Sequence, residues 1–194
     1  MRVVAAPLHR VFVAALELQT ELEALGLPFC FIGGLALQRW GEIRFTQDAD
    51  ATVLSAFDHD EEVIKRLFFH FKSRRPDGPE FALRHRVLLL EAANGVGLDV
   101  ALGALDFEER AVKRASLWSI PDGHALRTCS AEDLVVHKAF ASRDKDWMDI
   151  RGILQRQGRG LNLSQIFEEL RPLVALKEDE SILPRLEALA RNYL

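Results

Sequence analysis

The chain has 194 residues, of which 48% are hydrophobic, and its formal net charge is −4. This length and composition fit one globular unit, and the acidic balance excludes a protein that holds nucleic acid through a global basic field. No stretch approaches the roughly 18 uninterrupted apolar residues of a membrane span, and the N-terminal residues lack the apolar run of a secretory signal.

The first quarter of the chain predicts alternating helices and strands. The expected elements are a helix over 11–25, a strand over 29–32, a helix over 35–40, and a strand over 50–54 that extends back to 48. Gly26 ends the first helix, and Pro28 prevents it from resuming. Gly33 and Gly34 form the turn between the first strand and the second helix.

The middle of the chain predicts a hairpin between helices. The expected elements are a helix over 59–71, a charged turn over 73–79, strands over 86–92 and 98–102, a helix over 106–115, and short paired strands over 117–120 and 125–127. Asn94-Gly95 is a strong turn signal, so the strands that flank it should pair as a hairpin.

The last third of the chain is predicted to be helical. Ser130 is placed to cap a helix, with Asp133 at the capping-box position. Breaks are expected around 142–144, around 158–160 and near Pro172.

Strands therefore come first and helices afterwards. This order predicts an α+β fold with a small mixed sheet and a helical C-terminal half. We expect a core over 1–128 and a helical part over 129–194, packed together as a single compact unit.

Three aspartates mark the chemistry of the chain. Side chains alternate faces along a strand, so Asp48 and Asp50 share one face of their strand. Asp99 lies on the polar face of a later strand, beside the small residues Ala101 and Gly103. Carboxylates this close repel one another unless a cation lies between them, and Mg²⁺ favours hard oxygen ligands of this kind. Three carboxylates on neighbouring strands are suited to a metal-assisted phosphoryl displacement.

A phosphate site is predicted beside these acids. Gly33 and Gly34 open a helix directly after a strand, where backbone N–H groups and the helix start favour an anion. Arg44 and Thr46 lie between this turn and the acids, and they are candidate phosphate donors. Arg44 fits a structural ion pair equally well, and Thr46 fits a turn-stabilising role better.

The spacing of these motifs resembles the DNA polymerase β-like nucleotidyltransferase superfamily. Gly33-Gly34, thirteen intervening residues, Asp48-Ala49-Asp50 and a later Leu98-Asp99-Val100 are similar to its signature. A second patch, with Lys138 followed by Arg143, Asp146 and Asp149, is similar to the helix that follows the sheet in the same proteins. The resemblance covers roughly residues 28–154 and is nearest to two branches. One comprises AbiEii-type toxins of toxin–antitoxin systems and related minimal nucleotidyltransferases, and the other the aminoglycoside and lincosamide nucleotidyltransferases.

The resemblance implies a role for each matched residue. Asp48, Asp50 and Asp99 would be the catalytic carboxylates and would ligate Mg²⁺ or Mn²⁺, and Asp99 would help accept the proton of the incoming hydroxyl. Gly33 and Gly34 would hold the triphosphate of an NTP. Many members of the superfamily have Ser at the second glycine, so here backbone donors would act alone.

The resemblance gives the second patch a weaker assignment. Lys138 would reach the nucleotide phosphates, but a lysine on the buried side of a helix also fits a structural ion pair. Arg143, Asp146 and Asp149 are weaker candidates for the site. Asp146 and Asp149 fit equally well on a solvated helix face, where they would pair with Lys145 and Arg151.

The implied reaction transfers NMP from an NTP to a hydroxyl and releases pyrophosphate. The favoured acceptor is RNA, in particular tRNA, or a protein hydroxyl, since the basic segment 72–75 and the cations Arg143, Lys145 and Arg151 would give an acidic protein a local basic rim. The toxin branch would add an antitoxin partner. The alternatives are a small-molecule nucleotidyltransferase and a catalytically silent nucleotide-binding domain. Two cysteines without metal-ligand spacing fit a reducing compartment, so we expect a cytoplasmic protein without a membrane partner.

Overall fold

A computed structural model of the protein describes residues 9–42, 45–55, 59–120 and 123–193. The helices are α1 (Arg10–Ala24), α2 (Gly33–Trp40), α3 (Asp60–His70), α4 (Gly78–His85), α5 (Asp106–Arg114), α6 (Ala131–Ala141), α7 (Asp144–Gln157), α8 (Leu163–Lys177) and α9 (Ile182–Ala190). The strands are β1 (Phe29–Phe31), β2 (Asp48–Val53), β3 (Lys72–Ser73), β4 (Val87–Glu91), β5 (Gly97–Leu102), β6 (Ser116–Ser119) and β7 (Ala125–Thr128). A 3₁₀ turn, η2 (Gly158–Gly160), links α7 to α8.

The strands form one mixed sheet. Within the described residues its order is β3-β4-β5-β2-β1-β7-β6. β2 pairs in parallel with β5, and β1 pairs in parallel with β7, while the other neighbours are antiparallel. The hairpin expected at Asn94-Gly95 joins β4 to β5. The predicted α+β class is confirmed.

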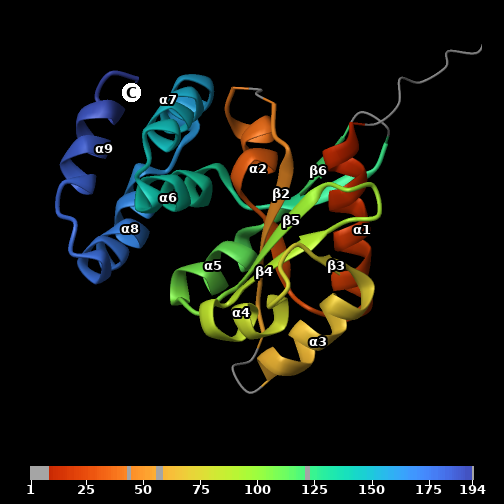
Figure 1. Cartoon of the computed structure of the whole chain (residues 1–194). Helices are drawn as coiled ribbons and strands as arrows, with labels where there is room; N and C mark the ends of the chain where they lie inside the picture. The colour runs from red at the N-terminus through yellow and green to blue at the C-terminus, as the bar shows by residue number, and fades with distance from the viewer. Residues whose placement is uncertain (1–8, 43–44, 56–58, 121–122, 194) are drawn as a thin grey trace, which may run out of the picture.

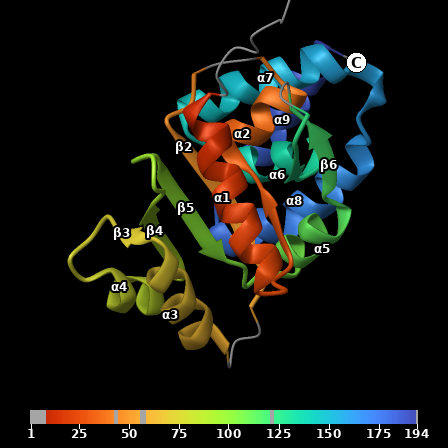
Figure 2. The ribbon, with the colours of Figure 1, turned by 90° about the vertical axis from the view of Figure 1, so that its right-hand side faces the viewer.

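The sheet separates two hydrophobic cores. Figures 1 and 2 show α1 on one side of the sheet and α6–α9 gathered on the other. Alternate residues of each strand feed the two cores: Phe29 and Phe31 pack with α1, whereas Cys30 packs with α2, α5 and the C-terminal helices. Burial raises the pKa of the Cys30 thiol to about 12, so this cysteine behaves as a small apolar residue. No helix in the described ranges is long and apolar enough to cross a membrane.

Helix α4 was not predicted. The expected charged turn over 73–79 is wrong at both ends, because Ser73 belongs to β3 and Gly78 begins α4. Pro79 lies in the first turn of α4, where its missing N–H has no intrahelical partner to lose. The helix ends at Arg86, which has φ 55° and ψ 32°, so the following strand begins at Val87 rather than at Arg86.

Two other elements differ from the prediction by more than one residue. Helix α2 begins at Gly33 rather than at Leu35, so both glycines lie in its first turn. The break expected near Pro172 is wrong, because α8 continues through this proline to Lys177. The chain leaves α8 at Glu178, which has φ 57°. Leu173 and Val174 are buried next to the proline, and their packing supports the helix despite one missing donor.

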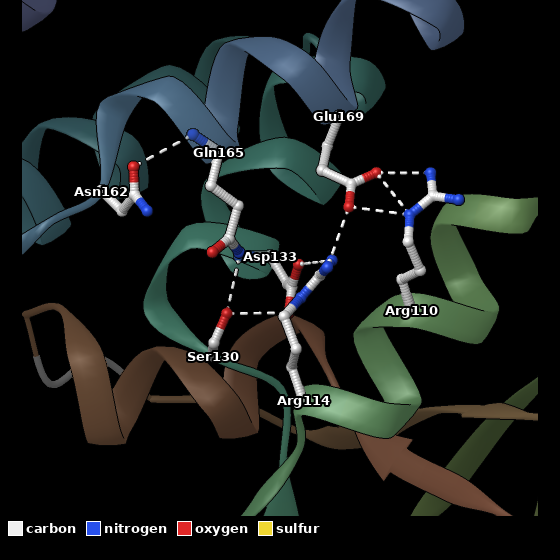
Figure 3. A network of polar contacts seen from close by, with 7 residues as sticks. All are labelled: Arg110, Arg114, Ser130, Asp133, Asn162, Gln165 and Glu169. Atoms are coloured by element: carbon white, nitrogen blue, oxygen red, sulfur yellow. Dashed lines mark hydrogen bonds and ion pairs between the residues drawn. The ribbon is translucent and has the colours of Figure 1, made fainter.

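An ionic cluster attaches the C-terminal helices to α5 (Figure 3). Glu169 of α8 accepts hydrogen bonds from Arg110 Nε at 2.9 Å and from Arg110 Nη2 at 2.6 Å. Arg114 reaches Glu169 at 2.9 Å and also donates to Asp133 of α6 at 2.6 Å. Ser130 caps α6 as predicted, with its hydroxyl accepting from the Asp133 backbone at 3.0 Å. The cluster therefore ties α5, α6 and α8 together.

Candidate active site

The three predicted carboxylates lie on two paired strands. In the parallel register of β2 with β5, Asp50 is opposite Asp99 and Asp48 is opposite Gly97. All three aspartates are half-buried, whereas the alternate residues Ala49 and Leu98 are fully buried. The alternation expected from the sequence is therefore present, and the acids share one face of the sheet.

The Gly33-Gly34 turn lies directly against these acids. The Gly34 backbone N–H forms a hydrogen bond with the Asp50 carboxylate. A Cβ atom at Gly33 would overlap that carboxylate, and one at Gly34 would overlap the Thr46 hydroxyl. Gly33 also has φ +58°, which disfavours other residues. Close approach and backbone conformation thus require glycine here, and the start of α2 faces an anion.

Thr46 organises the loop that leads into β2. Its hydroxyl lies 3.2 Å from both the backbone oxygen and the carboxylate of Asp48. These contacts fit the turn-stabilising role that the sequence favoured. The other candidate in this loop, Arg44, lies outside the described residues.

The electrostatics of the acids favour a cation. Burial raises the pKa of Asp50, and the neighbouring Asp48 charge raises it further. The Gly34 hydrogen bond and the charges of Lys138 and Lys145 act in the opposite direction. A part-buried carboxylate whose charge is destabilised by a neighbouring carboxylate suits a divalent metal such as Mg²⁺.

The third carboxylate is held by an arginine. Within the described residues, no three acidic, histidine or cysteine side chains are grouped closely enough to form a complete metal-binding cluster. The Asp99 carboxylate is paired with the guanidinium of Arg74, which follows β3. If all three acids held a metal, Arg74 would therefore have to release Asp99. Arg74 was not predicted as a site residue, although it belongs to the basic segment 72–75 that the sequence had placed at the rim.

The second patch forms a cluster between α6 and α7. Lys138 is 5% exposed, and its ammonium lies 2.6 Å from Asp149 and 3.7 Å from Asp146. Arg143 Nε donates to Asp146 at 2.6 Å. Burial alone would raise the pKa of Asp146, but the Arg143 hydrogen bond and the Lys138 charge outweigh burial and lower it. The four predicted residues thus come together, with Lys138 bound to acids of its own cluster.

Helix α7 also fixes the position of α2. Arg156 donates to the Gly41 carbonyl at 2.6 Å, and Gln157 donates to the Trp40 carbonyl at 2.7 Å. These bonds satisfy carbonyl groups at the C-terminal end of α2. The glycine turn at the other end of α2 is therefore held in place by the same helix that carries Asp146 and Asp149.

Neither a protein-family model nor a curated protein matches the sequence. Solved structures do resemble it. The solution structure of the antibiotic-resistance factor ANT(2'')-Ia aligns with a TM-score of 0.52 and 13% identity, over 91% of this chain and 96% of that one. An antigenic nucleotidyltransferase-like protein from Paracoccidioides brasiliensis aligns with a TM-score of 0.49 and 18% identity, over 94% and 95%. The lincosamide antibiotic adenylyltransferase LnuA, in its lincomycin-bound form, aligns with a TM-score of 0.46 and 13% identity, over 73% and 94%.

These likenesses concern the fold. The chain shares its fold with ANT(2'')-Ia, and this agrees with the fold that the motif resemblance implied. At this level of identity they do not favour the AbiEii-type branch over other branches of the superfamily.

Proposed function

We propose that the protein is a metal-dependent nucleotidyltransferase that transfers NMP from an NTP to a hydroxyl group. The observation that supports this most directly is the register that puts Asp50 opposite Asp99, with the Gly33-Gly34 helix start against Asp50. The site thus joins an anion-binding helix start to a group of oxygen ligands.

The residues would divide the reaction as follows. The N–H groups at the start of α2 would bind the triphosphate, and Asp48, Asp50 and Asp99 would hold Mg²⁺ or Mn²⁺. The bound metal would neutralise charge on the phosphates and on the attacking oxygen. Asp99 accepts the proton of the acceptor hydroxyl as its oxygen attacks the α-phosphorus. The bond from the α-phosphorus to the bridging oxygen breaks, and pyrophosphate leaves with that oxygen.

For the acceptor we favour RNA, with tRNA as the first candidate, ahead of a protein hydroxyl. Arg74 brings a positive charge directly to the acids, and Lys145 and Arg143 lie close enough to interact with Asp50 by charge. Such cations suit an acceptor that carries phosphates. In this reading the protein is a toxin-type nucleotidyltransferase with an antitoxin partner, acting in the cytoplasm.

A small-molecule acceptor is the second candidate. The likeness to an antibiotic-resistance factor over 91% of this chain favours an antibiotic-like alcohol. A cationic antibiotic would require acidic groups on the acceptor side of the site, whereas Arg74 lies beside Asp99. A catalytically silent domain is the third alternative, and the presence of all three carboxylates argues against it.

The test incubates the protein with each α-labelled NTP, Mg²⁺, and either total tRNA or an aminoglycoside. We expect labelled tRNA, and we expect Asp50→Asn to lower the rate by about 10²- to 10³-fold or more. Glu180→Gln is a control, because Glu180 is an exposed acid on the loop after α8. Labelled antibiotic without labelled tRNA would reverse the order of acceptors, and no product from any NTP would favour the silent domain.

Metal binding provides a readout that needs no acceptor. Metal and NTP at a hundredfold excess over Kd should stabilise the wild type by about 2.7 kcal/mol. Asp50→Asn should lose most of this gain and remain folded. An unchanged melting temperature of the wild type would contradict the proposal.

A further inference from the structure

The backbone of Arg74 is bonded to the sheet, and its side chain has room to extend toward the acids. Its N–H donates to the Leu89 carbonyl of β4 at 2.9 Å, and its guanidinium pairs with Asp99 of β5. Gly97 lies beneath this guanidinium, and a Cβ atom at Gly97 would lie 2.9 Å from Arg74 Nη1. The absence of a side chain at Gly97 therefore lets the guanidinium reach Asp99.

The neighbouring cations of the same segment are engaged elsewhere. Lys72 pairs with Glu91 at 2.9 Å, and Arg75 pairs with Asp77 at 2.8 Å. Arg75 also lies over the Phe81 ring, 4.3 Å from its centroid. In the segment 72–75, Arg74 is thus the cation directed at the carboxylates of the site.

Arg74 and the glycine turn approach the acids from opposite directions. The sheet order places β4 on one side of β5, and β2 followed by β1 on the other. Arg74 reaches Asp99 from the β4 side, whereas Gly33 and Gly34 follow β1. If the triphosphate occupies the glycine turn, the acceptor approaches Asp99 from the side of Arg74.

The ion pair is of a kind that a metal can displace. The side chains of Arg74 and Asp99 are 33% and 34% exposed, and ion pairs at this exposure contribute little to stability. The planar guanidinium of an arginine can form two parallel hydrogen bonds with a phosphate, as it does with a carboxylate. The partner that Arg74 loses when a cation takes Asp99 can therefore be replaced by a phosphate.

We propose that Arg74 determines acceptor specificity. Arg74 occupies Asp99 in the metal-free site, and a divalent cation that binds Asp99 frees the guanidinium to bind a phosphate of a nucleic-acid acceptor. This inference rests on the proposed function and adds to it a residue that makes acceptor binding depend on metal loading.

The first test is Mn²⁺ binding to the protein alone. Arg74→Met removes the competitor and should tighten Mn²⁺ binding about two- to fivefold, in line with the strength of a part-exposed ion pair. Gly97→Ala should act in the same direction while keeping the arginine, because its methyl group displaces the guanidinium. Lys72→Met, which removes a nearby charge that is paired with Glu91, should leave Mn²⁺ affinity unchanged.

The second test is retention of total tRNA, used as a probe, with Mn²⁺ and with EDTA. With Mn²⁺, Arg74→Met should weaken tRNA binding about tenfold, as expected for loss of a charged hydrogen bond, and with EDTA it should match the wild type. Lys72→Met should change binding less, and equally in both conditions. Equal losses in the two variants, or a loss from Arg74→Met that does not depend on Mn²⁺, would overturn the inference.

The outcomes separate this inference from the proposed function. Wild-type Mn²⁺ binding that Asp50→Asn abolishes, combined with unchanged affinity in Arg74→Met and Gly97→Ala, would refute the inference alone. Absence of Mn²⁺ binding by the wild type would refute both.

Discussion

Asp50 is a site residue whose charged form lowers the stability of the folded protein. Its carboxylate is half-buried, accepts from the start of α2, and lies beside Asp48. Burial and the Asp48 charge raise its pKa, so the folded protein holds this proton more tightly than the unfolded chain does. Stability therefore falls as pH rises from the ordinary carboxyl pKa through the raised one.

The fall of stability with rising pH gives a prediction for Asp50→Asn. Without metal, the variant should be more stable than the wild type at pH 7, because the amide cannot ionise. The difference should shrink as pH falls through the raised pKa of the wild-type Asp50 carboxyl, which is then protonated. Denaturant titrations at several pH values measure both effects, with Asp106→Asn as an exposed control on α5. A variant that is less stable than the wild type at pH 7 would contradict this assignment.

At the scale of elements, Lys138 joins α6 to α7. Lys138→Met should destabilise the protein by about 3 kcal/mol, because Asp146 and Asp149 would lose a cation inside the protein. Lys145→Met is the control, since Lys145 is exposed on α7, and it should change stability by less than about 0.5 kcal/mol. Chemical denaturation gives both values.

The same variant bears on the nucleotide role predicted for Lys138. A lysine that binds phosphate would lower NTP affinity when replaced, with little change in stability. If Lys138→Met is as stable as Lys145→Met but binds NTP more weakly, the structural assignment is wrong and the predicted phosphate contact is supported.

Most elements could be predicted because their signals are local. Apolar spacing located α1 and α3, and Asn94-Gly95 located the β4–β5 hairpin. Helix α4 was missed because Pro76, Gly78 and Pro79 are typical of a turn, and the helix depends on packing of Ala82 into the core. Packing likewise overrides the local effect of Pro172 within α8.

At the scale of the whole molecule, Glu169 attaches the C-terminal helices to α5. Its pKa is lowered chiefly by hydrogen bonding from Arg110, so the stability it contributes is present above the ordinary glutamate pKa and is lost as pH falls through the lowered value. Glu169→Gln should cost about 1–3 kcal/mol at pH 7, less than a fully buried pair, because both arginines are partly exposed.

Glu168→Gln, one position away on α8 and exposed, is the matched control. Thermal denaturation at pH 7 and at successively lower pH should show a difference between the two variants that shrinks as pH falls through the lowered pKa of Glu169. A difference that persists at the lower pH would mean that Glu169 acts through packing rather than charge.

The candidate site was predictable in part. Asp48, Asp50 and Asp99 could be assigned to one face of the sheet from strand alternation and motif spacing, because both signals depend only on positions in the sequence. The Arg74–Asp99 pair could not, since it depends on how β3 packs beside β4. The ion-pair partners of Lys138 could not be predicted for the same reason, because they depend on how α6 and α7 pack against each other.

The parallel pairing of β2 with β5 also has a consequence for a chain that is still being made. Parallel strands cannot join through a hairpin, and here α3, β3, α4 and β4 lie between the two partners. Pairings between strands so far apart in the chain are slow to form. Asp99 therefore stays apart from Asp48 and Asp50 until synthesis has passed Leu102 and the intervening unit has docked. A ribosome-bound fragment that ends before Asp99 would hold no assembled group of three carboxylates, so the proposed activity can begin only after this part of the chain has been made.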